Sequence, residues 1–307
     1  MNAVVPLPLP SYTHIVLSGG GMCGLSYTGI YRYLKQYKLL GQLRHLVGCS
    51  MGSIFVFLIA LNLPVETLET LILETTCDIE LNTFDPENIL FISDKKGIFS
   101  LERYDALFQK AINLVYKDVG RITLQEFSKL TGKNIYFTVF CLNTLNVEYL
   151  SNTTTPDIDL FQAIRASMAI PGLFHPVIIN DKCYVDGGVC ASLPLSCMEY
   201  KETDKVLAIN ISFKPYKSNT ELEDILVYTK QIIGAVLFSK VFQTVKDYMN
   251  ISNIDLMTID DNPVDFMPME IINDKIILNI TEENLNQATL YGYQKFYEYM
   301  KEKYPRT

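Results

Sequence analysis

The sequence predicts an α/β protein whose central sheet is mostly parallel. Over the first 65 residues, apolar stretches with strand character alternate with helix-like stretches. This is the order of elements in parallel layered folds. The first two strand-like stretches each run into a glycine-containing turn, at Gly19–Gly21 and around Ser50. The 307 residues are 49 % hydrophobic and 20 % charged, a composition typical of a folded globular protein.

The amino-terminal part of the chain carries the clearest element signals. We expect strands at Ile15–Leu17 and His45–Val47, and helices over Leu25–Leu40 and Ser53–Leu63, with Gly41 ending the first helix.

The uncharged run Leu46–Val65 has twenty residues, enough to cross a bilayer. Gly48, Gly52 and Pro64 favour a buried strand, turn and helix instead, because a sheet covered on both faces also produces continuous apolar runs.

The remaining elements are predicted from apolar periodicity and turn residues. Residues 82–96, which contain Pro86, are expected to form a surface excursion that serves as a connector or as a lid. No internal repeat or low-complexity linker marks a boundary, so we expect one domain over residues 1–307. The expected helices are Glu66–Thr76, Leu101–Val115, Leu160–Met168, Glu221–Met249 (one or two, with a break at Gly234) and Glu282–Lys301. The expected strands are Asn134–Leu142 and Asn146–Leu150 as a hairpin, Lys182–Val185, Val206–Ser212 and Ile254–Ile259.

Charge and cysteine content argue against several classes of protein. The net charge of −8 disfavours a general nucleic-acid binder. Seven cysteines without C-x-x-C spacing disfavour a zinc module and a disulfide framework. The amino terminus lacks a basic region and is broken by prolines, so it does not resemble a signal peptide. We therefore expect a cytoplasmic, reducing location and no bound metal.

The glycine loop Gly19–Gly24 satisfies the pattern G-x-G-x-x-G after a strand and before a helix. A dinucleotide-binding fold needs an acidic residue about 20 residues further on. The first acid in this chain is Glu66, and the Gly-Lys-[Ser/Thr] of a P-loop is missing. Both nucleotide interpretations are disfavoured. Glycine amides at a helix start remain a good site for an anion, including one created during catalysis.

Ser50 lies in the pattern G-x-S-x-G, between an apolar strand and an uncharged helix. This context is typical of a nucleophile held on a sharp strand-to-helix turn. The positive end of the helix dipole would favour a serine alkoxide there. The alternative interpretation is an ordinary serine cap of the helix.

A nucleophilic serine needs a base, and the chain has three histidines. Of these, only His175 lies downstream of Ser50, as an α/β-hydrolase order requires. Its neighbours Phe174 and Pro176 indicate a packed loop. A Ser-His-Asp esterase that uses His175 stays an alternative.

Asp186 is a second candidate for the base, because it ends a strand and is followed by Gly187 and Gly188. Two glycines allow the aspartate to approach another loop closely. A carboxylate within reach of a serine hydroxyl can accept its proton, and burial raises the carboxylate pKa toward a useful range. The alternative is a turn aspartate, since Asp-Gly is a common turn pair.

Four motifs in order resemble those of the patatin-like phospholipases. They are Gly19–Gly24, Gly48–Gly52, Ala163–Pro176 and Asp186–Gly188. The resemblance covers about residues 13–212 and implies a three-layer α/β/α fold. We expect residues 213–307 to pack on that core. It also implies that no metal or organic cofactor is needed.

The family pattern assigns roles to these residues. It implies that Ser50 attacks an ester carbonyl and that Asp186 acts as general base and then as acid. The amides of Gly19, Gly20 and Gly21 would line the oxyanion hole, and an acyl-enzyme on Ser50 would be hydrolysed by water. The implied function is that of a lipid acyl hydrolase of phospholipid or lysophospholipid. The glycines that support the motifs are Gly24, Gly48, Gly52, Gly187 and Gly188.

Two positions depart from the family pattern. Cys23 stands where the family usually has Arg or Lys, a cation that Arg32, Arg44 or Arg165 would have to replace. Met51 stands where the family usually has alanine, and its bulk would narrow the entry or reshape the acyl pocket. A catalytically weak lipid-binding protein is therefore a further alternative. Ile54, Phe55, Phe57 and Leu58 are expected to line an acyl site or to belong to the core.

A lipid substrate implies peripheral contact with a membrane. Residues 1–65 contain four basic residues and no Asp or Glu, which favours an anionic lipid surface. The alternative is an ordinary solvated helix face. Some members of the family need an activating protein partner, and nothing in the sequence indicates whether this chain does.

Overall fold

The computed structural model describes residues 9–76, 83–84, 94–212, 225–272, 275–278 and 280–305. Its main sheet has eight strands in the order β11-β10-β1-β2-β5-β9-β8, with β6 also paired to β5. From β11 to β5 neighbouring strands are parallel, and β6, β8 and β9 add antiparallel pairs. A mostly parallel central sheet is confirmed. The strands are β1 (His14–Leu17), β2 (His45–Cys49), β5 (Asn134–Cys141), β6 (Asn146–Ser151), β8 (Val177–Ile179), β9 (Lys182–Asp186), β10 (Val206–Ile211) and β11 (Ile254–Ile259).

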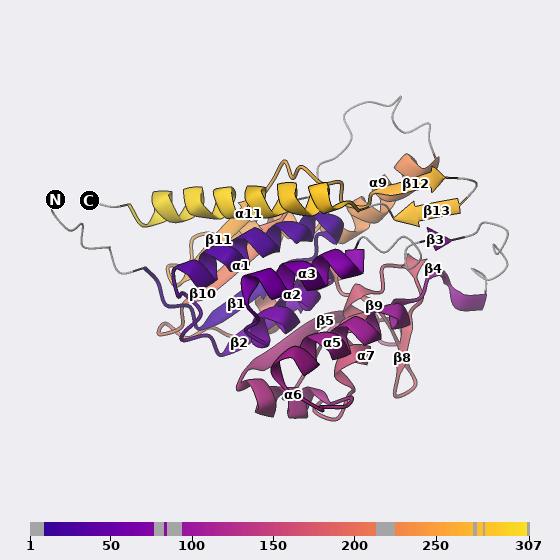
Figure 1. Ribbon diagram of the computed structural model, residues 1–307, viewed down its shortest axis with the longest axis horizontal. Helices are drawn as coiled ribbons and strands as arrows, with labels where there is room; N and C mark the ends of the chain where they lie inside the picture. The colour runs from indigo at the N-terminus through magenta and orange to yellow at the C-terminus, as the bar shows by residue number, and fades with distance from the viewer. Residues whose placement is uncertain are drawn as a thin grey trace.

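Helices cover both faces of this sheet, because alternate side chains of the buried strands point to opposite sides. Ile15 and Leu17 of β1 join the larger apolar core under α1, α2 and α11 (Figure 1). Val16, between them, joins a second core with Val241 at the start of α10. The α/β/α layering is thereby confirmed. The helices are η1 (Gly21–Ser26), α1 (Tyr27–Gln36), α2 (Met51–Ala60), α3 (Val65–Thr76), η3 (Leu101–Tyr104), α5 (Asp105–Val115), α6 (Leu124–Thr131), α7 (Leu160–Met168), α8 (Gly188–Ala191), η4 (Leu195–Cys197), α9 (Ile225–Phe238), α10 (Val241–Tyr248) and α11 (Glu282–Lys303).

The carboxy-terminal helix α11 lies along α1, as Figure 1 shows. Glycines permit this close packing. A Cβ on Gly29 would lie 1.9 Å from the carbonyl oxygen of Thr289, and one on Gly292 would lie 2.0 Å from that of Ser26. The segment after residue 212 thus supplies β11 to the main sheet and α11 to one of its faces. The expectation of one domain over the whole chain stays a prediction.

Several elements differ from the sequence expectations. The helix expected at 25–40 begins as the 3-10 turn η1 and ends at Gln36. The expected break at Gly234 is wrong, since Gly234 lies inside α9 and the break falls at residues 239–240. The helix α6 and some short strands were not anticipated. These strands are β3 (Thr83–Phe84), β4 (Gly97–Phe99), β7 (Gly172–Phe174), β8, β12 (Met269–Ile272) and β13 (Lys275–Leu278). Residues 82 and 85–93 of the predicted excursion, and residues 221–224 of the predicted helix, lie outside the described residues.

No helix in the described part of the chain has the length and apolar character to cross a membrane. The uncharged run at 46–65 forms most of β2, all of α2 and the turn before α3, as its glycines and proline indicate. In the same part of the chain, all six cysteines are free, and no cluster of three potential metal ligands occurs.

Candidate active site

Ser50 lies on the tight turn between β2 and α2. Its backbone has φ 53° and ψ −124°, and such a positive φ is rare for a residue with a side chain. Its side chain makes no capping hydrogen bond to α2, so the interpretation as a plain helix cap receives no support. A Cβ on Gly48 would lie 2.6 Å from the Gly52 carbonyl oxygen, and one on Gly52 would lie 2.5 Å from that of Leu17. Both motif glycines are therefore required by close backbone contact.

The strand register brings Asp186 next to this turn. Cys49 pairs with Thr138 of β5, and the next β5 residue, Val139, pairs with Asp186 at the end of β9. Gly187 then packs against the same strand, since a Cβ there would lie 2.5 Å from the Thr138 carbonyl oxygen. The Asp-Gly-Gly motif thus allows the close approach that its composition predicts.

The Asp186 carboxyl is fully buried, and its two oxygens have different surroundings. Oδ1 accepts the Gly188 amide at 2.7 Å and the Cys49 thiol at 3.6 Å. Oδ2 has no hydrogen-bond partner among the described residues. Burial raises the pKa of Asp186 to about 6, and the Ser50 hydroxyl opposes this rise. Ser50 therefore lies beside the carboxyl without completing a hydrogen bond to Oδ2.

Ser167, near the end of α7, braces the Ser50 turn. The Ser50 amide donates to the Ser167 carbonyl and hydroxyl oxygens, at 3.1 Å each. Ser167 Oγ in turn donates to the Thr138 carbonyl at 2.7 Å and lies 2.7 Å from Ser53 Oγ. Two residues further, the Ala169 carbonyl accepts the Asp186 amide at 2.9 Å. Sequence reasoning recognised this segment as a motif but missed its role, which is to hold both Ser50 and Asp186.

The three glycines of the loop after β1 are not equivalent. The Gly19 amide donates to the Ser192 carbonyl at 2.9 Å, so it is not available to an oxyanion in this conformation. No hydrogen bond engages the amides of Gly20 and Gly21 within the described chain. Gly21 has φ 49°, and a Cβ there would lie 2.3 Å from the Phe266 carbonyl oxygen. Of the three amides expected to line an oxyanion hole, those of Gly20 and Gly21 have no hydrogen-bond partner in the described chain.

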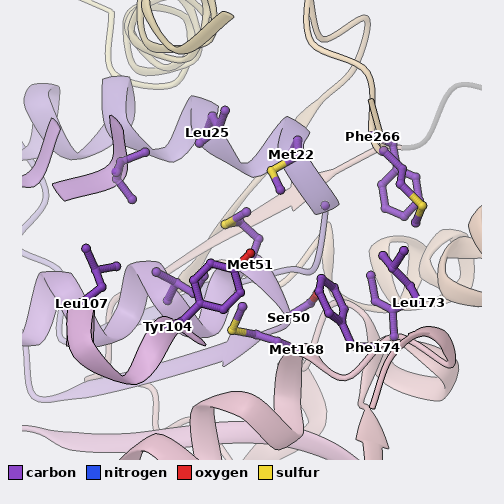
Figure 2. A pocket seen from close by; sticks show the side chains of 15 residues that line it. Met22, Leu25, Ser50, Met51, Tyr104, Leu107, Met168, Leu173, Phe174 and Phe266 are labelled. Atoms are coloured by element: carbon purple, nitrogen blue, oxygen red, sulfur yellow. The ribbon is translucent and has the colours of Figure 1, made fainter. Parts of the chain in front are cut away.

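An apolar cavity of about 70 Å³ opens onto Ser50 (Figure 2). Its walls include four methionines, which are flexible and adapt to irregular shapes. Met51 packs over Gly24, where a Cβ would lie 2.3 Å from its Cγ. Of the four apolar residues expected from α2, Ile54 lines the cavity, and Phe55, Phe57 and Leu58 belong to the core. The cavity is lined by Gly21, Met22, Leu25, Ser50, Met51, Ile54, Ile72, Tyr104, Leu107, Met168, Ile170, Leu173, Phe174, Phe266 and Met267.

Among the described residues, no arginine lines the cavity to replace the cation that the family usually has at position 23. Cys23 is buried, and its thiol donates to the Val264 carbonyl at 3.1 Å. Arg32 pairs with Glu69, and the buried Arg165 contacts Glu102 and Asp105, both at 3.5 Å. These two arginines and Arg44 are absent from the lining of the cavity. They therefore do not supply a cation to the cavity wall in this conformation.

None of the three histidines lines the cavity at Ser50. His14 and His45 begin β1 and β2, at the opposite end of these strands from Ser50, and their rings stack at 4.5 Å. His175 is influenced electrostatically by Lys95, Glu102 and Arg103, and it is absent from the cavity lining. No histidine affects the pKa of Asp186. A triad built on His175 receives no support from this geometry.

The comparisons with known proteins agree with the fold and with the sequence motifs. A family model described as patatin-like phospholipase matches residues 15–196. This chain therefore belongs to the patatin-like phospholipase family, whose members are lipid hydrolases.

Several related proteins have names that denote the hydrolysis of lipids. The chain is 26 % identical over 290 residues to a probable lipid hydrolase, 463L, of Invertebrate iridescent virus 6, covering 91 % of this chain and 88 % of that protein. It is 28 % identical over 206 residues to lysophospholipase NTE1 of Scheffersomyces stipitis, covering 64 % of this chain but 11 % of that protein. It is 27 % identical over 234 residues to triacylglycerol lipase 4 of Saccharomyces cerevisiae, covering 66 % of this chain and 25 % of that lipase.

Among solved structures, VipD from Legionella pneumophila superposes with a TM-score of 0.51 and 18 % identity, over 95 % of this chain and 67 % of VipD. The ExoU–SpcU complex from Pseudomonas aeruginosa includes a chain that superposes with a TM-score of 0.51 and 16 % identity, over 96 % of this chain and 52 % of that one. At these identities the likeness establishes the fold.

Proposed function

We propose that this chain is a lipid acyl hydrolase that cleaves carboxylic esters with Ser50 as nucleophile and Asp186 as its base. One observation carries the proposal. A serine on a strained turn lies at an apolar cavity and beside a buried carboxylate that keeps one oxygen without a partner. Strained backbone of this kind clusters at functional sites.

In the first step, Ser50 Oγ attacks the ester carbonyl carbon while Asp186 Oδ2 accepts the hydroxyl proton. The negative charge that develops on the carbonyl oxygen is stabilised by the amides of Gly20 and Gly21 and by the amino-terminal end of α2. These amides have no other partner in the described chain, so no protein hydrogen bond has to break.

In the second step, protonated Asp186 gives its proton to the leaving alcohol oxygen, and the acyl group stays on Ser50. Water then attacks the acyl-enzyme with Asp186 again as base, which releases the fatty acid and restores the serine. A carboxyl pKa of about 6 suits both directions of transfer near neutral pH.

The apolar lining favours the acyl chain of a phospholipid or lysophospholipid as the group that enters the cavity. At about 70 Å³ the cavity is smaller than the roughly 300–1,000 Å³ of sites for larger ligands, so it has to widen on binding. The methionines Met22, Met51, Met168 and Met267 provide walls that can move without loss of apolar contact.

We also propose that the chain meets its substrate by peripheral contact with a lipid surface through α9 and α10. Tyr228, Ile232 and Val236, spaced four residues apart, form an exposed apolar face on α9. Phe242 on α10 is also exposed, at 78 %. The exposed Lys240 and Lys246 lie on the same segment and complement anionic lipid.

The helix α9, which carries this face, also contacts the cavity wall. Phe238, at the end of α9, packs edge-on against Phe266, which lines the cavity. By contrast, the basic amino-terminal segment is partly neutralised, because Arg32 is paired with Glu69.

The direct test is release of free fatty acid from mixed phospholipid vesicles by the wild type, Ser50→Ala and Asp186→Asn. We expect the wild type to be active and both variants to be inactive. His175→Ala, as a matched control for the triad alternative, should keep its activity. If the wild type is silent on vesicles, on a soluble ester and with cell extract added as a source of an activating protein, the hydrolase proposal is wrong and a lipid-binding protein remains.

A further inference from the structure

We propose that Cys49 is a positioning residue whose thiol holds Asp186 Oδ1, so that Oδ2 is the oxygen that receives the Ser50 proton. The assignment of a proton transfer to Oδ2 rests on the function proposed above. The thiol–carboxylate contact does not depend on it.

The geometry separates the two carboxyl oxygens. Cys49 is the last residue of β2, is fully buried and places Sγ 3.6 Å from Asp186 Oδ1. The Gly188 amide approaches the same oxygen at 2.7 Å. Two donors therefore converge on Oδ1, whereas Oδ2 has none in the described chain. A carboxylate held by one oxygen presents the other in a constant direction.

The Asp186 carboxylate and the Cys49 thiol both pack near Gly188. A Cβ on Gly188 would lie 3.0 Å from Asp186 Oδ1 and 3.8 Å from Cys49 Sγ, so glycine, thiol and carboxylate fill this space together. Serine at position 50 follows directly in the chain. The same backbone turn therefore fixes the nucleophile and the group that orients its base.

The Cys49 thiol stays protonated, and can donate its hydrogen bond, over the pH range in which Asp186 titrates. Burial, together with the nearby Asp186 charge, raises the pKa of Cys49 well above its ordinary value. Such a thiol is a weak nucleophile and stays protonated. Its hydrogen bond favours the charged form of Asp186 and opposes the rise in pKa that burial causes.

Few other groups act on this carboxyl. In the described chain its pKa is affected by the Ser50 hydroxyl, the Gly188 amide and the Cys49 thiol. The packed neighbours Thr138 of β5, Ala169 after α7 and Leu237 of α9 carry no charge. Lys240, after α9, contacts Cys190 Sγ. Removal of the Cys49 donor should therefore be visible in the titration of Asp186.

The test compares Cys49→Ala with Cys49→Ser, two variants of nearly equal volume that differ by a hydroxyl donor. In a plot of kcat/KM against pH, we expect Cys49→Ala to shift the acidic limb to higher pH by about half a unit to one unit. Cys49→Ser should move it less, because a donor is kept. Cys141→Ala, which removes a buried thiol from the neighbouring strand β5, is the matched control and should leave the limb in place.

A second readout makes the result independent of turnover. The Asp186 carboxyl carbon is followed by NMR during a pH titration of 13C-aspartate-labelled protein, and its resonance is identified by its loss in Asp186→Asn. A higher Asp186 pKa in Cys49→Ala than in Cys49→Ser supports the proposal, even if no fatty acid is released. Equal Asp186 pKa values in the wild type and both Cys49 variants would overturn the positioning role of Cys49. The hydrolase function would be unaffected by that result, because fatty-acid release tests it separately.

Discussion

The amide of Ser50 donates to both the carbonyl and the hydroxyl oxygen of Ser167, at 3.1 Å each. A non-glycine residue with φ 53° stores strain, typically on the order of 1–3 kcal/mol, and persists only where its surroundings hold it. Ser167 supplies that restraint from α7. The turn that carries Ser50 thus depends on a residue more than a hundred positions away in the chain.

Ser167→Ala tests this restraint. The variant keeps the carbonyl contact but loses the hydroxyl bonds to the Ser50 amide, Thr138 and Ser53, so the free energy of unfolding should fall by about 1–3 kcal/mol. Fatty-acid release should fall as well. Urea unfolding measures the first effect. Ser192→Ala is the matched control, because Ser192 Oγ is buried without a hydrogen-bond partner in the described chain and its loss should leave stability nearly unchanged.

The glycine loop gives a second prediction. Gly21→Ala places a Cβ 2.3 Å from the Phe266 carbonyl in a backbone with φ 49°, so the loop must shift and its amides leave their positions. Loss of an oxyanion donor typically costs about 10²–10³ in kcat, and we expect a loss of this size. Steady-state kinetics measure it. Gly41→Ala, at a glycine with open space around it, should retain wild-type kcat. Equal kcat values for both variants would exclude the loop from catalysis.

The raised pKa of Asp186 predicts an effect on stability. The carboxyl titrates near 3.8 when unfolded and near 6 when folded, so the folded state retains its proton longer. The stability contributed by this group is lost as pH rises through that window, on the order of 3 kcal/mol in total. Asp186→Asn does not titrate. Its stability relative to the wild type should therefore be higher at pH 7.5 than at pH 4.5 in urea unfolding. A difference that does not change with pH would contradict the buried, desolvated carboxyl.

The size of the cavity predicts selectivity for acyl length. Leu107 of α5 lines the cavity, and Leu107→Phe should fill part of it (Figure 2). We expect hydrolysis of long-chain esters to fall by about tenfold or more, with short-chain esters less affected, since overpacking typically costs about 1–3 kcal/mol. Leu114→Phe on the same helix, where the leucine is 52 % exposed, is the control. Equal losses for short and long chains would argue against an acyl site.

The apolar face of α9 and α10 predicts membrane binding. Ile232→Asp and Phe242→Asp should each weaken sedimentation with anionic phospholipid vesicles while the activity on a soluble short-chain ester stays at the wild-type level. Leu290→Asp, at an exposed leucine on α11, is the matched control and should bind vesicles normally. If all three variants bind like the wild type, the lipid surface contacts another face.

Local patterns predicted much of this fold because they depend on residues close in sequence. The strand-turn-helix around Ser50 could be read from Gly48 and Gly52, whose backbone contacts lie within the same unit or the neighbouring strand. Short strands such as β7 and β8 were missed, since three residues carry too little periodicity to identify.

Long-range contacts could not be read from the sequence in the same way. The Gly19 amide is engaged by Ser192, and Ser167 braces Ser50. Arg32 and Arg165 were considered as replacements for the cation that the family usually has at position 23, but they pair with carboxylates outside the cavity lining. In each case the deciding partner comes from a distant part of the chain.

Covalent labelling of Ser50 by a fluorophosphonate tests the central claim most directly. We predict that intact wild-type protein gains one adduct, that peptide mapping places it on Ser50, and that Ser50→Ala gains none. Asp186→Asn should be labelled at least a hundredfold more slowly, because its amide cannot accept the serine proton. An unlabelled wild type, or an adduct formed equally fast in Asp186→Asn, would contradict the Ser50–Asp186 pair.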